Sequence, residues 1–150
     1  METLPSSGRV ILVGAGPGAP DLLTLRAARA LAAADVVVHD GLIDPAVLDL
    51  APGARRIDVS KKRARHTLPQ DAIGALLVAE AQAGRLVVRL KGGDPFIFGR
   101  GGEEVEACDA AGVAVEVIPG VSSALGAAAA ALPSRPAEHN RRARIRDIFM

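Results

Sequence analysis

Short apolar runs alternate with segments of helical periodicity along most of the chain. The run at residues 10–13 is apolar at every position rather than at alternate positions, which is typical of a parallel strand buried on both faces. We expect strands at residues 10–13, 36–38, 57–59, 86–90 and 113–118. The segments between them carry apolar residues three and four positions apart, which predicts helices at residues 21–34, 45–50, 67–84, 102–111 and 121–131.

Local signals mark the ends of some of these helices. Thr67 and Gln70 have the spacing of a capping box, and Gly84 closes the same predicted helix. Leu22 and Leu25 are expected on the apolar face of the first helix. Strands that alternate with helices favour right-handed crossovers, so the sequence predicts an α/β fold with a parallel five-stranded sheet and helices on both faces.

Composition narrows the functional classes. The formal net charge is +1, so the chain lacks the large single-sign field that attracts nucleic acid or anionic membranes. The single cysteine, Cys108, forms no intramolecular disulfide and offers no metal cluster, which favours a reducing, cytoplasmic setting. Residues 1–9 do not have the pattern of a secretory signal, and the apolar runs are shorter than a membrane span requires.

The character of the chain changes after Pro133. Residues 134–150 are rich in charge and poor in apolar periodicity. We expect a poorly ordered tail there, which leaves the chemistry of the chain to the preceding residues.

The first candidate site is the glycine-rich segment that follows the first predicted strand, residues 14–24. Glycines at this position let the backbone turn sharply and approach a ligand. Gly14, Gly16 and Ala19 also fall at the spacing of a dinucleotide-binding loop, with Asp40 about 20 residues further on. Pro17 and Pro20 are evidence against a dinucleotide-binding loop, because proline has no N–H to donate to a pyrophosphate. A plain tight turn is the structural alternative.

The second candidate site follows the strand at 86–90, where residues 92–104 read GGDPFIFGRGGEE. Repeated glycines, an acid before proline and two aromatic residues exceed what a simple connection needs. These two segments, together with PGVSSA at residues 119–124, resemble the signature of the tetrapyrrole methylases. The amino-acid sequence from Val88 to Glu104 is similar to that of the uroporphyrinogen-III C-methyltransferase branch of the family.

The resemblance implies two α/β domains with S-adenosylmethionine bound between them, usually in a homodimer. Residues 9–133 would form the first domain, and the second domain would be absent. By motif match, the residues that contact S-adenosylmethionine would be Pro17, Gly92, Gly93, Asp94, Ile97, Ser122 and Ser123. Asp94 also has a structural alternative, since an acid before proline can accept hydrogen bonds from loop amides.

The same resemblance implies two catalytic residues. Asp40 matches the family's proton acceptor, and Lys61 matches its proton donor. Read without the resemblance, Asp40 is equally a turn or capping acid, and Lys61 is a solvated surface residue. His39 and Gly41 depart from the usual Tyr and Arg on either side of the acid. The cationic residues around Lys61 suit a carboxylate-rich substrate, with an exposed basic loop as the alternative.

The implied reaction is methyl transfer to uroporphyrinogen III, which gives precorrin-2 for sirohaem and cobalamin biosynthesis, without a metal. We expect weak cofactor binding and little turnover from a single domain. Two other classes stay open: an NAD-binding α/β module, and a fragment without catalytic activity that pairs with intact subunits.

Overall fold

The computed structural model describes residues 8–60 and 70–131 of the 150-residue chain. Five strands pair in parallel in the order β3-β2-β4-β1-β5. The strands are β1 (Arg9–Gly14), β2 (Val36–His39), β3 (Arg55–Asp58), β4 (Leu86–Lys91) and β5 (Ala114–Ile118). The helical segments are η1 (Pro20–Leu22), α1 (Leu25–Ala33), α2 (Pro45–Leu48), α4 (Gln70–Gln82), α5 (Gly101–Ala110) and α6 (Ser123–Ala130). The predicted fold class is therefore confirmed.

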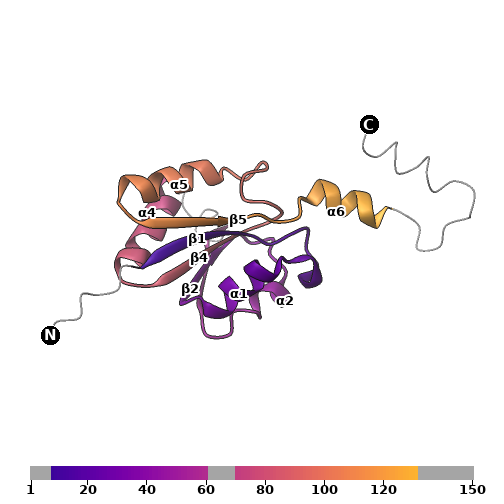
Figure 1. The fold of residues 1–150 in the computed structure, drawn as a ribbon, viewed down its shortest axis with the longest axis horizontal. Helices are drawn as coiled ribbons and strands as arrows, with labels where there is room; N and C mark the ends of the chain where they lie inside the picture. Colours follow the sequence, from indigo (N-terminus) through magenta and orange to yellow (C-terminus); the bar gives the residue numbers. More distant parts are fainter. Residues whose placement is uncertain (1–7, 61–69, 132–150) are drawn as a thin grey trace, which may run out of the picture.

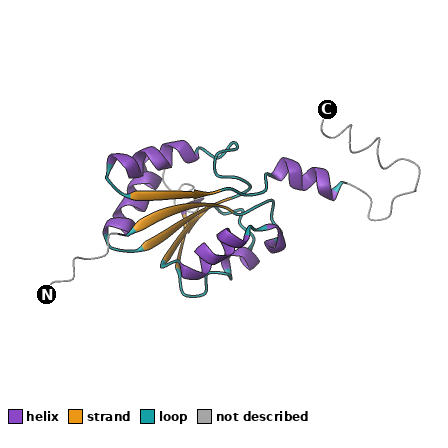
Figure 2. Cartoon of the chain, in the orientation of Figure 1, coloured by secondary structure: helices purple, strands orange, loops and turns teal. Residues whose placement is uncertain are grey.

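The sheet forms a central layer with helices on both sides (Figure 2). Successive side chains of a strand point to opposite faces. Ile11 and Val13 accordingly join one apolar cluster, which α1 and α2 cover, while Val10 and Leu12 join another beneath α4 and α5. Figure 1 shows these two helix pairs on opposite sides of the sheet. Because alternate side chains of β1 enter different clusters, this continuously apolar strand contributes to both hydrophobic cores.

The strand order brings the two glycine-rich segments to the same edge of the sheet. β1 lies next to β4, with Gly14 beside Lys91 in the register, so both strands end at the same level. β5 flanks β1 on the other side and leads into the loop before α6. In parallel sheets, ligands bind at this carboxyl edge.

The first helix differs from the prediction. Pro20 begins the short 3-10 segment η1, and Leu23 and Thr24 are extended before α1 starts. The Thr24 hydroxyl accepts a hydrogen bond from Ala27 N at 3.1 Å and so sets the start of the helix. Leu22 and Leu25 are 42% and 77% exposed, so the expectation that they face the core is wrong. Thr24 resets the helical phase, and the buried residues of α1 begin at Ala27.

The remaining boundaries agree within a few residues. β3 starts at Arg55, before the predicted residue 57. Thr67 of the expected capping box and the tail after Pro133 lie outside the described residues. Within the described ranges, no helix has the length and apolar character needed to cross a bilayer.

Candidate ligand-binding site

The two glycine-rich segments pair directly with each other. Gly16 and Gly93 form an isolated antiparallel bridge, in which Gly93 N donates to Gly16 O at 2.8 Å and Gly16 N donates to Gly93 O at 3.2 Å. Ala15 N also donates to Lys91 O at 2.7 Å. The loop after β1 is therefore joined to the loop after β4, and the two act as one wall.

A third loop packs against this wall at a point where only glycine fits. A Cβ atom on Gly120 would lie 2.2 Å from Gly93 O and 2.8 Å from Gly14 Cα. A Cβ atom on Gly14 would meet Gly120 Cα at 2.6 Å. Because these neighbours are backbone atoms, they cannot move aside as a flexible side chain does. The three loops approach at glycine positions, which holds the residues after β5 close to the first two loops.

Asp94 fastens the third loop to the second. Its Oδ1 accepts hydrogen bonds from the N–H groups of Phe96 and Ile97 at 2.9 and 3.3 Å, and its Oδ2 accepts from Gly120 N at 3.1 Å. Burial opposes the ionised form, but these three amides outweigh it and hold the pKa of Asp94 below its usual value. Asp94 therefore accepts hydrogen bonds from loop amides, which is the structural role that the sequence also suggested for it.

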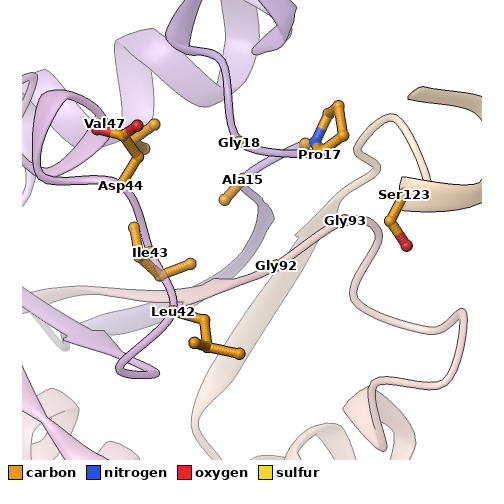
Figure 3. A pocket seen from close by; sticks show the side chains of 11 residues that line it. Ala15, Pro17, Gly18, Leu42, Ile43, Asp44, Val47, Gly92, Gly93 and Ser123 are labelled. Atoms are coloured by element: carbon orange, nitrogen blue, oxygen red, sulfur yellow. The ribbon is translucent and has the colours of Figure 1, made fainter. Parts of the chain in front are cut away.

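A pocket of about 290 Å³ opens beside the joined loops. Figure 3 shows Leu42 and Ile43 on one side of it, Pro17 and Ser123 on the opposite side, and Gly93 between them. The complete lining consists of Ala15, Gly16, Pro17, Gly18, Leu42, Ile43, Asp44, Val47, Gly92, Gly93 and Ser123. The lining is apolar with exposed backbone groups, as is usual for sites that bind small organic ligands.

Two lining glycines keep the pocket open. A Cβ atom on Gly18 or on Gly92 would meet nothing within 4 Å, so a side chain there would stand in open space at the pocket wall. Gly18 also has a φ of +137°, a conformation that favours glycine. These positions allow a ligand to approach the backbone closely, which fits a cofactor with amino, carboxylate and hydroxyl groups.

The structure brings together some of the predicted cofactor residues. Four of the seven line the pocket: Pro17, Gly92, Gly93 and Ser123. Ser122 is the residue that precedes α6, and Ile97 is 54% exposed in the loop after β4. Neither belongs to the lining, and neither does Asp94, which instead fixes the loops.

Asp40 lies at the carboxyl end of β2, two residues before the part of the lining that starts at Leu42. Its Oδ1 accepts a hydrogen bond from Arg89 Nη2 at 3.0 Å. The Asp40 side chain is 43% exposed, whereas the Arg89 side chain is 2% exposed. The ion pair therefore joins a buried cation to an accessible carboxylate.

Arg89 belongs to a buried ionic network that the sequence analysis missed. Its Nε donates to Glu104 Oε1 at 3.1 Å, and Lys91 Nζ lies 3.2 Å from both Glu104 oxygens. Two cations and two carboxylates thus balance in charge. Burial lowers the pKa of Lys91, while Glu104 acts in the opposite direction. The available signal was the charged pair Arg89 and Lys91, which falls on one face of an otherwise apolar strand.

Lys61 lies outside the described residues, as does the basic stretch that follows it. Its predicted role therefore stays a prediction. Among residues 8–60 and 70–131, no group of three or more His, Cys, Asp or Glu side chains has the arrangement of a metal site.

The dinucleotide alternative does not match the arrangement of the first loop. Its Gly16 N–H is committed to Gly93 O, and the following α-helix begins only at Leu25. The Thr24 hydroxyl already occupies one amide at the start of that helix. A dinucleotide loop instead leads straight into a helix whose free amides face the pyrophosphate.

Comparison with known proteins places these features in a family. The family model described as Tetrapyrrole (Corrin/Porphyrin) Methylases matches residues 9–141. A siroheme synthase from Hahella chejuensis is 51% identical over 145 residues, which are 95% of this chain and 31% of the relative. The chain therefore spans about a third of the length of that relative.

Solved structures give the same result. The crystal structure of uroporphyrin-III-C-methyltransferase from Thermus thermophilus is 52% identical, with a TM-score of 0.72 over 85% of this chain and 54% of that chain. A second structure of the Thermus thermophilus enzyme, complexed with S-adenyl homocysteine, is 53% identical with a TM-score of 0.69 and covers 84% of this chain and 49% of that chain.

Proposed function

The chain belongs to the tetrapyrrole (corrin/porphyrin) methylase family, and from this we propose that it forms the cofactor-side wall of an S-adenosylmethionine-dependent uroporphyrinogen-III C-methyltransferase. The product would be precorrin-2, which serves sirohaem and cobalamin biosynthesis. The siroheme synthase and the Thermus enzyme support this choice of branch.

One observation carries the proposal: the Gly16–Gly93 bridge joins the two glycine-rich loops along one side of an open apolar pocket. The relative with bound S-adenyl homocysteine shares this chain's fold at 53% identity. A pocket wall made mainly of backbone and apolar side chains, with Asp44 as the charged residue of the lining, suits a ligand whose polar ends need hydrogen bonds and whose adenosine part needs apolar contact.

Different residues of the pocket would bind different parts of S-adenosylmethionine. Backbone groups of Pro17 and Gly92, together with the Ser123 hydroxyl, would bind its polar parts. Gly93, whose N–H and C=O pair with Gly16, would contact the cofactor through its Cα, and Ile43 would pack against the apolar surface of the cofactor. When bound, this cofactor supplies a methyl group that is activated by a positively charged sulfur. The protein then needs to orient the acceptor carbon, remove a proton and exclude water.

Asp40 is the group proposed to accept that proton. It stands at the carboxyl edge of the sheet, is accessible, and engages Arg89 through Oδ1. Lys61 would donate a proton on the substrate side, by resemblance to the family motif. Asp94 would contribute by fixing the loops around the pocket. Ser122 and Ile97, which lie outside the lining, would contact the cofactor by resemblance to the family motif.

The assembly is also part of the proposal. Residues 9–133 would act as the first domain of a homodimeric, cytoplasmic enzyme whose second domain completes the cleft. Helix α6 supports an apolar partner surface, since it has the sequence SALGAAAA and no buried residue, and it projects beyond the sheet (Figure 1). The buried free thiol of Cys108 fits the reducing location.

Calorimetric titration of the chain with S-adenosylhomocysteine tests the proposed pocket. We expect weak but measurable binding, and a loss of about tenfold or more in the Gly92→Val variant, because the Cβ atom at this position meets nothing within 4 Å and the side chain would occupy pocket space. Gly53→Ala is the matched control, since its Cβ atom also meets nothing and Gly53 is outside the pocket lining.

NADH serves as the competing ligand in the same experiment. The proposal expects no heat from NADH. Binding of NADH that Gly92→Val abolishes would favour the nucleotide-binding alternative instead. Binding of S-adenosylhomocysteine that is equal in wild type and Gly92→Val would contradict the proposed pocket.

A further inference from the structure

Arg89 is the most constrained cation at the carboxyl edge of the sheet. Its guanidinium is held from three directions: Nε by Glu104, Nη2 by Asp40, and Nη1 by the carbonyl oxygens of Val38 and Leu90 at 3.5 and 3.4 Å. The guanidinium is planar, so contacts on three nitrogens fix its orientation. Its contact to Asp40 therefore has one defined geometry.

The need to pair buried charges does not explain why Arg89 also binds Asp40. Glu104 is 1% exposed and needs a cation, and both Arg89 and Lys91 supply one. Asp40 is 43% exposed, so water can solvate it without help. The hydrogen bond thus fixes Oδ1 of the accessible Asp40 carboxylate against the buried guanidinium of Arg89.

The backbone of Asp40 is fixed as well. The His39 ring Nδ1 lies 2.9 Å from the Asp40 carbonyl oxygen, which also accepts a hydrogen bond from Ile43 N at 3.4 Å. The pocket lining begins at Leu42 in the same turn. Backbone and carboxylate are therefore both immobilised next to the pocket, an arrangement that suits recognition of a ligand group at a defined place.

We propose that Arg89 is a positioning residue, which orients the Asp40 carboxylate so that it binds the pyrrole N–H groups of a tetrapyrrole at the rim of the pocket. This inference rests on the proposed function and extends it to substrate recognition. A pyrrole N–H is a donor without a negative charge, and a carboxylate whose Oδ1 is occupied presents Oδ2 to it as a charge-assisted acceptor.

The test is fluorescence titration of the full chain with uroporphyrin III, the oxidised fluorescent form of the proposed substrate. Arg89→Lys keeps the charge but loses the planar fork, and Asp40→Asn removes the charge of the acceptor. We expect each to weaken binding about tenfold, as loss of one charge-assisted hydrogen bond does. The double variant should bind like either single variant, because both changes remove the same contact.

Arg56→Lys is the control, since Arg56 pairs with Asp49 at the surface and neither residue lines the pocket. It should leave porphyrin binding unchanged. The dissociation constant for S-adenosylhomocysteine should stay within about twofold in all variants, which a general loss of structure would not allow. Arg89→Lys binding at the wild-type level, or losses that multiply in the double variant, would overturn the inference.

Two further outcomes separate the inference from the proposed function. A chain that binds S-adenosylhomocysteine but not uroporphyrin III refutes the inference alone, and a chain that binds neither refutes both. If circular dichroism shows that Arg89→Lys is unfolded, Asp40→Glu decides, because it keeps the charge but moves the carboxylate by one methylene. A loss of about tenfold supports positioning; wild-type binding overturns it.

Discussion

Asp94 shows how one carboxylate can organise a site without lining it. Its two oxygens accept three backbone hydrogen bonds, two from its own loop and one from Gly120 in the loop after β5. Loops that lack regular secondary structure need such partners for their amides. The residue that the family motif assigns to the cofactor thus acts here on the shape of the pocket wall.

Replacement of Asp94 by Asn should lower the free energy of unfolding at neutral pH by about 1–3 kcal/mol, because the amide group replaces one acceptor by a donor. The pKa of Asp94 is held below its usual value of 3.8, so the stabilisation is present above that value and is lost as pH falls through the lower pKa of the folded state.

Urea unfolding at pH 7 and at successively lower pH measures this difference. The gap between wild type and Asp94→Asn should narrow as the pH falls below 3.8. Asp109→Asn, an exposed change on α5, should leave both values close to wild type. A gap that is constant down to the acid limit would mean that the ionised form of Asp94 is not what stabilises the loops.

At the scale of elements, the sequence predicted the alternation of strands and helices well, because buried parallel strands appear in the sequence as short apolar runs. All five strands and the helices after them occur close to the expected residues. The break before α1 was missed, since Leu22 and Leu25 fit a helical period and the extended backbone of Leu23 and Thr24 interrupts it. Periodicity records which residues are apolar, and a local cap decides where the helix begins.

The site was predictable only in part for the same reason. The glycines after β1 and β4 stand out in the sequence, and the parallel topology brings them together. Leu42, Ile43 and Val47 line the opposite side of the pocket, yet they look like ordinary loop and helix residues. Their place depends on how α2 packs against the sheet, which a linear pattern does not specify.

The junction of the three loops yields a prediction for Gly120→Ala. The added Cβ atom would lie 2.2 Å from Gly93 O, so the loop after β5 must move away from the bridge. We expect destabilisation by about 1–3 kcal/mol, in the range of overpacked interiors, and weaker binding of S-adenosylhomocysteine.

Gly102→Ala is the companion variant, measured by the same thermal melts and calorimetry. Its Cβ atom meets nothing within 4 Å, and the residue lies in the first turn of α5. Alanine there should stabilise the helix by up to about 1 kcal/mol and leave binding unchanged. Equal behaviour of the two variants would show that close packing at Gly120 does not hold the loops.

For the molecule as a whole, the unusual feature is a neutral set of four charges at the carboxyl end of the sheet, three of them buried in a mainly apolar interior. β4 supplies Arg89 and Lys91, α5 supplies Glu104, and the end of β2 supplies Asp40. Buried ions are costly unless they are paired, so the three buried charges, Arg89, Lys91 and Glu104, depend on one another. The network connects the central strand to one helix layer and to the rim of the pocket.

Glu104→Gln should therefore destabilise the protein far more than Glu103→Gln, although the two residues are neighbours on α5. Loss of the Glu104 charge leaves two buried cations facing one carboxylate, which costs about 3–5 kcal/mol in comparable buried pairs. Glu103 pairs with Arg100 at the surface, with side chains 47% and 55% exposed, and such pairs contribute about 1 kcal/mol at most.

The pH dependence identifies the cause of this difference. Burial already lowers the pKa of Lys91 from 10.5, and Glu104 opposes that shift, so its removal lowers the pKa further. Between the folded pKa and 10.5 the unfolded chain binds more protons, and stability then rises with pH. The deficit of Glu104→Gln in urea unfolding should thus be smaller near pH 10 than at pH 7. An equal deficit at both values would point to lost packing rather than to a stranded charge.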